Sequence, residues 1–287
     1  MKLTDRDRAI LRSLYDYRYL STDQLRRLHF PSQQTLNRRI RLLAGGGFLV
    51  DSSVPGTAER LLGLSSRGAA VVAEHIGTPM DALEWSRRRA VPTDYYFIKH
   101  FLMINDLRIA LKSSCELQDG VSLLGFLPEY LGKATPHGRQ KRLRDVATDQ
   151  QGSSITHTPD GVFALRRNGS AALFFLEADR GTEVLSDPNR GYLKMLRFYL
   201  NHLAGGEYQK HKRDFDVSTD FALFRVLIVT TSMRRLEHMR EAARSVPFQP
   251  AHAKRFIWLA AADAINDHNF LTTDWFSVGD DQLYSIL

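Results

Sequence analysis

The stretch THTPDGVFALRRNGSAALFFLEADRGTE, residues 156–183, decides the expected fold of this chain. Asn168-Gly169 lies between two runs rich in apolar residues, and Asn-Gly in that place is a strong signal for a two-residue hairpin turn. Such a turn fixes the strand register, so Asp160 should face Glu177. Side chains alternate between the two faces of a strand, so Asp179 shares a face with Glu177. The open end of the predicted hairpin therefore carries three carboxylates on one side.

These three carboxylates indicate a metal site. Like charges that face each other destabilise a sheet, and a divalent cation would offset them. Mg²⁺, with Mn²⁺ as a substitute, is commonly held by one or two carboxylates together with phosphate oxygens. We therefore expect Asp160, Glu177 and Asp179 to be metal ligands. The alternative is a solvated hairpin end, but the apolar run Ala172–Leu176 predicts a central strand that is buried on both faces.

The composition is that of a globular protein, with an uneven distribution of charge. The chain has 287 residues and a net charge of +7, which suits one large or two ordinary domains. Its first 92 residues hold 15 Lys and Arg against 9 Asp and Glu. This concentration predicts a polyanionic partner, with nucleic acid favoured over membrane. Cys115 is the only cysteine, which excludes an internal disulfide and fits a cytoplasmic location; we expect no signal peptide and no membrane span.

The first ninety residues predict a winged helix-turn-helix. Capping residues predict helices that start after Thr4, Ser21 and Ser32, and a run of glycines ends the third helix. Residues 48–64 then resemble a two-stranded wing, with a polar turn through Pro55-Gly56, and a closing helix follows from Ser66. In a winged helix-turn-helix the third helix enters the major groove of DNA.

The outer face of this third helix is polar and basic. Gln, Asn and Arg side chains pair with base edges, and further basic side chains contact phosphates. We expect the DNA-contacting residues to be Gln33, Gln34, Asn37, Arg38 and Arg41 of the helix, with Arg60 of the wing. A protein-interaction module with a solvated helix face is the alternative. The basic segment from Trp85 to Arg89 is interpreted as a linker that touches DNA phosphate or as a solvated charge run.

The remainder of the chain predicts an α/β domain with a mixed sheet. We expect a long helix over 94–114, a strand over 121–127, a mobile loop over 132–156, and then the hairpin. A helix should start at Asp187-Pro188, followed by a strand over 223–230, a helix capped by Ser232 and a strand over 254–259. The predicted fold class is therefore α+β: a winged helix-turn-helix over 1–80, a linker over 81–92 and an α/β domain with a restriction-endonuclease-like fold over 93–287.

Two resemblances follow from these elements. Pro159-Asp160, followed by Glu177-Ala178-Asp179 on the next strand, resembles the PD-(D/E)xK nuclease superfamily over roughly residues 93–260. The whole chain resembles the replication-relaxation family of bacterial mobile elements. That resemblance rests on residues 3–7 with the helices after them, on TPDG at 158–161 and on FLEADRGTE at 175–183. It implies a winged helix joined to a nuclease-like domain, and a role in plasmid replication or mobilisation.

The chain departs from the nuclease motif at one position. The motif requires Lys two residues after Glu177, where this chain has Asp179, and an acid cannot replace a cation that steadies charge on phosphorus. Lys194 on the next helix is a candidate replacement, and Arg180 is a second. Asp179 is otherwise a third metal ligand, or Arg180 neutralises the acids as a structural ion pair. Glu129 is a further candidate for the acidic set.

Three functions are consistent with these patterns. The missing lysine favours a DNA-binding protein of a mobile element whose nuclease-like domain is inactive and serves for docking or dimerisation. Its partners would be double-stranded DNA and a relaxase or replication protein. The alternative is an active, divalent-metal-dependent DNA endonuclease in which Asp160 and Glu177 bind metal and Lys194 or Arg180 stabilises the transition state. A transcription regulator that senses a small ligand is a third hypothesis.

Overall fold

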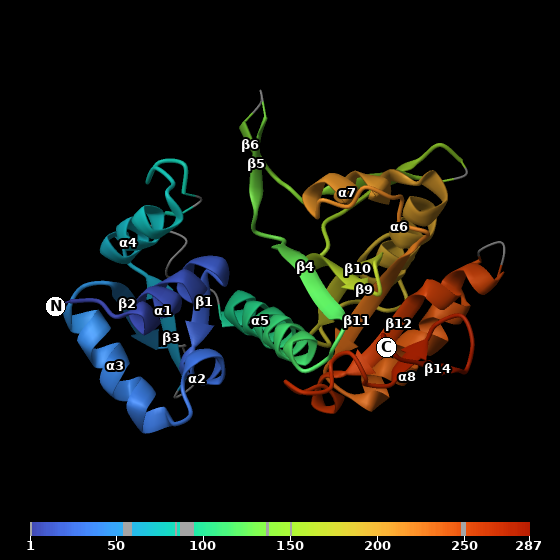
Figure 1. The fold of residues 1–287 in the computed structure, drawn as a ribbon. Helices are drawn as coiled ribbons and strands as arrows, with labels where there is room; N and C mark the ends of the chain where they lie inside the picture. Colours follow the sequence, from blue (N-terminus) through green and yellow to red (C-terminus); the bar gives the residue numbers. More distant parts are fainter. Residues whose placement is uncertain are drawn as a thin grey trace. The chain divides into compact units, whose positions relative to one another are not determined.

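The computed structural model describes residues 2–53, 59–83, 85–86, 95–135, 138–149, 151–247 and 251–287. The chain divides into two compact units, residues 1–109 and 110–287, which are described separately (Figure 1). The boundary falls inside the helix α5 (Tyr95–Glu116), whereas the sequence had suggested a linker over 81–92. Among the described residues, no helix is long and apolar enough to cross a membrane. The predicted turn at Pro55-Gly56 and residues 87–89 of the basic segment lie outside the described residues.

The N-terminal unit combines helices with a small antiparallel sheet in the strand order β1-β3-β2. Its elements are α1 (Asp5–Asp16), β1 (Tyr19–Ser21), α2 (Thr22–His29), α3 (Gln33–Gly45), β2 (Leu49–Ser53), β3 (Arg60–Leu64) and α4 (Ser66–Ile76). The three predicted N-caps are confirmed, since Thr4, Ser21 and Ser32 each accept a hydrogen bond from a backbone N–H of the helix that follows. The strand β1, which the sequence patterns did not indicate, adds a third strand to the two that were predicted.

Two contacts fix α3 within this unit. Leu36, Ile40 and Leu43 point into the core and are at most 1% exposed. Arg39 forms an ion pair with Asp7, which is fully buried at the start of α1. The inner face of α3 is thus held by both apolar packing and a salt bridge, and the opposite face of the helix remains available to solvent.

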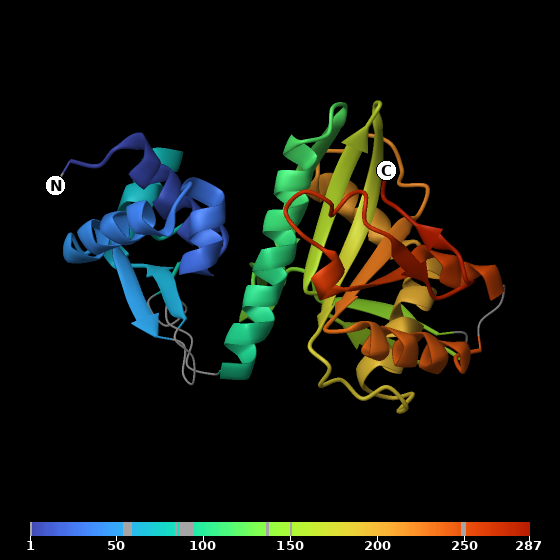
Figure 2. The same cartoon turned by 90° about the horizontal axis from the view of Figure 1, so that it is seen from below.

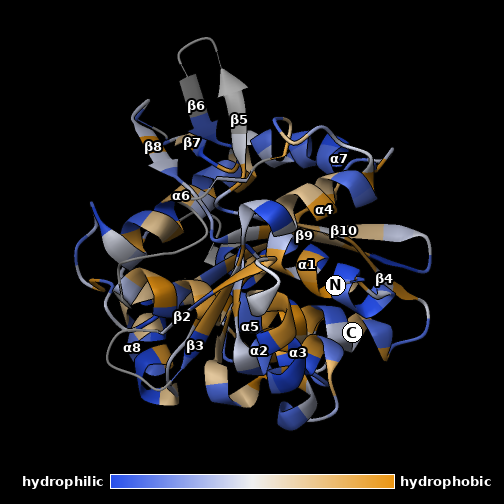
Figure 3. Ribbon diagram, turned by 90° about the vertical axis from the view of Figure 1, so that its left-hand side faces the viewer, coloured by the Kyte–Doolittle hydropathy of each residue, from blue (hydrophilic) through white to orange (hydrophobic). Residues whose placement is uncertain are grey.

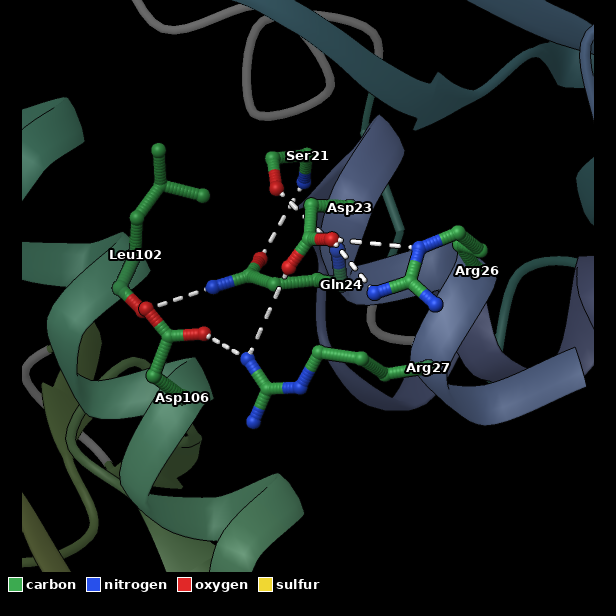
Figure 4. A network of polar contacts seen from close by, with 7 residues as sticks. All are labelled: Ser21, Asp23, Gln24, Arg26, Arg27, Leu102 and Asp106. Carbon is green, nitrogen blue, oxygen red and sulfur yellow. Dashed lines mark hydrogen bonds and ion pairs between the residues drawn. The ribbon is translucent and has the colours of Figure 1, made fainter. Parts of the chain in front are cut away.

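The first part of α5 completes the N-terminal unit (Figure 4). Gln24 closes the capping box of α2 with Ser21, and its Nε2 donates to the carbonyl oxygen of Leu102 at 2.8 Å. Arg27 of α2 pairs with Asp106. These contacts use polar groups of α2 that would otherwise be open to an external partner.

The C-terminal unit is built on a mixed sheet that has seven strands among the described residues, in the order β14-β13-β12-β11-β10-β9-β4. Strands β10, β11 and β12 are parallel, and the other pairs are antiparallel. The strands are β4 (Val121–Pro128), β9 (Gly161–Arg167), β10 (Ser170–Asp179), β11 (Phe224–Thr230), β12 (Ile257–Ala261), β13 (Trp275–Ser277) and β14 (Leu283–Tyr284). The α+β class and the mixed sheet are therefore confirmed.

The helices α6 (Gly191–Gly205) and α8 (Met233–Arg244) pack on one face of this sheet. Phe175 of β10 points to that face and contacts Tyr199 of α6, with ring centroids 5.4 Å apart. Phe174 points to the other face, where it stacks on Phe163 of β9 at 4.9 Å. In Figure 3, hydrophilic and hydrophobic residues alternate along α8, as expected of a helix with one buried face.

The expected hairpin is present with the expected register, and Figure 2 shows its two long strands in yellow-green. Ser170 pairs with Arg167, and Phe174 pairs with Phe163. The turn residues Asn168 and Gly169 both have positive φ, at 49° and 82°, as a two-residue turn of this kind requires.

Three other expectations are corrected. The stretch 132–156, expected as a loop, instead contains the strands of two short hairpins, β5 (Gly132–Thr135) with β6 (Gly138–Lys141) and β7 (Asp145–Thr148) with β8 (Ser154–His157). Helix α6 begins at Gly191, with Arg190 as its N-cap, and not at Asp187-Pro188. The strand expected over 254–259 is β12, and the residues before it form the 3₁₀ helix η3 (Ala251–Phe256). The chain also contains η2 (Glu207–Lys210), α7 (His211–Asp214) and η4 (Ala262–Ala264).

Candidate functional site

The three acids of the hairpin lie at the end of β10, where the register places them. The β9–β10 ladder ends at the pair Gly161 and Leu176, so Asp160 and Glu177 are the next residues along the two strands. Glu177 and Asp179 alternate with Ala178 and point to the face that α6 and α8 cover. Glu177 is 7% exposed and Asp179 is 5% exposed. Carboxylates this deeply buried need partners.

Asp179 is held by a salt bridge and a hydroxyl. Nε and Nη2 of Arg235 on α8 donate to its two carboxylate oxygens at 3.0 and 3.2 Å. Thr230, at the end of β11, donates its hydroxyl to Oδ2 at 2.6 Å. Arg235 also donates to the carbonyl oxygen of Glu183 at 2.6 Å. Asp179 thus acts in this structure as one half of a buried ion pair, and Arg235 supplies a counter-charge.

Glu177 is held by two side chains that the sequence patterns did not single out. Its Oε1 lies 2.6 Å from Nε2 of His157, and the hydroxyl of Tyr199 on α6 donates to the same oxygen. Burial raises the pKa of Glu177 above its ordinary value. Burial opposes the charged form of His157, but the Glu177 carboxylate outweighs this effect and raises the pKa of His157. The pair therefore retains a proton more strongly than either group would in water.

Asp160 lies directly before β9 and is tied to β10 through the backbone. Its Oδ2 accepts a hydrogen bond from the amide of Ala178 at 2.8 Å. The amide of Glu129 donates to the carbonyl oxygen of Asp160 at 3.0 Å, so Glu129 is a neighbour of the acidic pair. The Glu129 carboxylate is engaged by Nζ of Lys141 at 2.7 Å.

Lys194 lies on α6, the helix that also carries Tyr199, and its positive charge partly offsets the rise in the pKa of His157. Helix α6 thus contributes Tyr199 to the surroundings of Glu177. Arg180 follows β10 directly and is half-buried. The proposed roles of Lys194 and Arg180 in catalysis stay predictions.

The expected metal site is only partly assembled. Among the residues that the structure describes, no three His, Cys, Asp or Glu side chains are placed so that they could hold a metal ion. The third predicted ligand, Asp179, has both of its oxygens engaged by Arg235. Asp160 and Glu177 remain as two adjacent carboxylates, a number that suffices for Mg²⁺ only when water and phosphate oxygens complete the coordination shell.

The predicted DNA-contacting residues occupy the outer face of α3. Gln34, Arg38 and Arg41 are exposed, as is Gln33, whose amide donates to Oδ1 of Asn37 at 3.0 Å. Neither Arg38 nor Arg41 has a carboxylate partner in the described part of the chain. Arg60 differs, because it pairs with Asp51 across the two strands of the wing. Trp85, which the sequence suggested as linker, donates its indole N–H to the carbonyl oxygen of Leu64 at 3.1 Å.

Searches of curated proteins and of solved structures found no match. A family model described as replication-relaxation matches residues 11–217, which is more than half of the chain. The match covers α2, α3 and the wing of the N-terminal unit, and in the C-terminal unit it covers the hairpin and α6. The chain therefore belongs to the replication-relaxation family, which associates it with the replication or mobilisation of mobile elements.

Proposed function

We propose that this protein binds double-stranded DNA through α3 and serves a mobile element as a DNA-binding factor whose nuclease-like domain is inactive. The observation that carries the proposal is the pair of exposed arginines on the outer face of α3, since both lie on one helix face beside polar amide side chains. Arg12, Arg26, Arg27, Arg39 and Arg60 each pair with a carboxylate of the same unit. Arg38 and Arg41 are exposed on one face of α3 and have no such partner among the described residues; Arg6 and Arg67 share this property, but Arg6 lies over the Phe30 ring and Arg67 donates to the carbonyl oxygen of Gly46.

This arrangement suits a helix that enters the major groove. Arginines that are already paired lose part of their attraction for phosphate, whereas exposed, unpaired arginines release counterions when they bind a phosphate. Gln34 lies beside Arg38 on the exposed face and supplies the amide chemistry that recognises adenine. The inner face of α3 is fixed by the core and by the Arg39–Asp7 pair, so the outer face is presented on a rigid support.

Binding to a 30-base-pair duplex, measured by fluorescence anisotropy over a range of salt concentrations, tests the proposal. Replacing Arg38 and Arg41 together with Ala should weaken binding and reduce the slope of log K against log salt by about 1.8, since each lost phosphate contact contributes roughly 0.9. The control variant replaces Arg12 and Arg26 with Ala. It removes the same amount of positive charge, but from helices other than α3. Equal slopes for both double variants would contradict the assignment to α3.

The inactive state of the second domain is supported by Asp179. Asp179 occupies the position at which the nuclease motif has Lys, and its carboxylate accepts hydrogen bonds from Arg235 and Thr230. Without a cation at that position, a bound phosphate lacks the charge that would stabilise its transition state.

An active endonuclease is the second candidate, and it is favoured by the carboxylates of Asp160 and Glu177, which follow each other across the end of the β9–β10 ladder. In that case Asp160 and Glu177 would hold a Mg²⁺ ion, which would stabilise developing charge on phosphoryl oxygens. Cleavage of supercoiled and linear DNA with Mg²⁺ or Mn²⁺, compared among wild type, Asp160→Ala and Glu177→Ala, separates the two functions. Cutting that both substitutions abolish would establish the nuclease, and intact DNA with undiminished duplex binding supports the inactive scaffold.

A further inference from the structure

The C-terminal unit contains an open pocket of about 540 Å³ beside the acidic pair. Its lining consists of Gln140, Lys141, Arg144, Thr156, His157 and Thr158. Three of these side chains are basic and three are neutral hydrogen-bond donors. The lining contains neither a carboxylate nor an apolar side chain, so its chemistry is that of an anion site and differs from the apolar pockets typical of drug-like ligands.

The pocket residues are next in sequence to side chains that are buried in the core of the C-terminal unit. Leu143, between Lys141 and Arg144, is 2% exposed and belongs to the main core of this unit. Ile155, directly before Thr156, is 7% exposed and belongs to the same core. The donors are therefore presented by backbone segments whose neighbouring side chains are fixed in the core, and little ordering is required when an anion binds.

The three basic side chains of the pocket differ in how far a carboxylate already neutralises them. Arg144 is exposed and has no side-chain partner among the residues that the structure describes. Lys141 shares its charge with Glu129, at 2.7 Å. His157 forms the boundary between pocket and acids, because its ring lines the pocket while its Nε2 lies 2.6 Å from Glu177. Arg144 should consequently contribute the largest part of anion binding, through the paired N–H groups that suit a phosphate.

We propose that this pocket binds a phosphate group of a single nucleic acid strand and places it beside Glu177 and Asp160. A strand is favoured over a free nucleotide because the pocket is open, and the His157 imidazole, which is the one aromatic ring in its lining, is already hydrogen-bonded to Glu177. The choice of nucleic acid rests on the proposed function, whereas the recognition of phosphate rests on the pocket alone. The proposal applies equally to an active and an inactive domain.

The test uses the full chain carrying Arg38→Ala and Arg41→Ala, so that the contribution of α3 is already removed. A 12-nucleotide single strand with a 5′-phosphate is the probe, and its binding is measured by anisotropy at low salt. Arg144→Gln should weaken binding about tenfold, as expected for the loss of hydrogen bonds to a charged group. Lys141→Gln should weaken binding less, because the ion pair with Glu129 already neutralises part of the positive charge of Lys141.

The matched control is Arg166→Gln, which removes an exposed arginine of the same unit near the hairpin turn and should change affinity less than twofold. Competition with dAMP and with inorganic phosphate at equal concentration identifies the source of the anion, and weak competition by both supports the strand. Equal effects of Arg144→Gln and Arg166→Gln would overturn the proposal that the pocket binds the phosphate. Full displacement of the probe by dAMP would overturn the choice of a strand as the ligand. Either failure leaves duplex binding by α3 untouched, because that binding is measured separately.

Discussion

Replacing Arg235 with Met should strongly destabilise the C-terminal unit. The substitution keeps an unbranched stem on α8 but removes the guanidinium that neutralises Asp179. The side chain of Asp179 is 4% exposed and that of Arg235 is 18% exposed, so water cannot replace the lost partner fully. Removing one member of a buried pair typically costs 3–5 kcal/mol. Thr230 still donates to Asp179, which places the expected loss near the lower end, at about 3 kcal/mol.

Urea unfolding followed by tryptophan fluorescence measures this loss, since Trp258 and Trp275 are both buried in the C-terminal unit. Arg244→Met on the same helix is the control, because Arg244 pairs with Asp281 at the surface and their side chains are 66% and 85% exposed. That variant should lose less than about 0.5 kcal/mol. The double variant Asp179→Asn with Arg235→Met should recover part of the loss, because no uncompensated charge is left. A loss below about 1 kcal/mol in Arg235→Met would refute the explanation of Asp179 as a structural ion-pair partner.

Two further predictions concern packing and pH. Gly68→Ala in α4 should destabilise the N-terminal unit by about 2 kcal/mol, because the added Cβ would lie 2.0 Å from the carbonyl oxygen of Phe48. This clash should outweigh the higher helix propensity of Ala. A variant that proves equally or more stable in thermal unfolding would contradict the close approach of Gly68 to Phe48. His202 is fully buried, and burial lowers its pKa to about 4, so the unfolded chain takes up a proton first as pH falls. The free energy of unfolding is therefore independent of His202 titration above about pH 6.5, and it falls by about 3 kcal/mol between pH 6.5 and 4. His202→Phe should flatten that part of the curve of unfolding free energy against pH, and an unchanged slope would show that other groups are responsible.

The local part of this structure could be predicted from the sequence. Capping residues such as Ser21 and Ser32 determine where helices start, and Asn168-Gly169 determines a hairpin register, because both signals act within a few residues of the chain. The placement of Asp160 opposite Glu177 follows directly from that register. Local signals were weaker over 132–156, where short strands of polar composition resemble a loop.

The partners of the acids could not be predicted, because they come from distant segments. Nothing in the order of residues connects Arg235 with Asp179, or Tyr199 with Glu177, until the sheet and its helices are assembled. His157 lies close to Asp160 in the sequence and was the one partner that proximity could have indicated. For the same reason the sequence showed a charge cluster at Asp179 but did not show Arg235, which pairs with this carboxylate. The role of Asp179 as a metal ligand stays a prediction.

The continuity of α5 limits how this chain can be divided or recombined. A fragment that starts at residue 93 would carry Phe101 and Leu102 without α2 and β1, and a fragment that ends at residue 92 would lose the acceptor of Gln24 and the partner of Arg27. Either fragment would expose surface that the intact chain buries. An exchange of DNA-binding modules between relatives, in the laboratory or in evolution, would therefore need a crossover point near Ile109 and would have to preserve the helical phase across it.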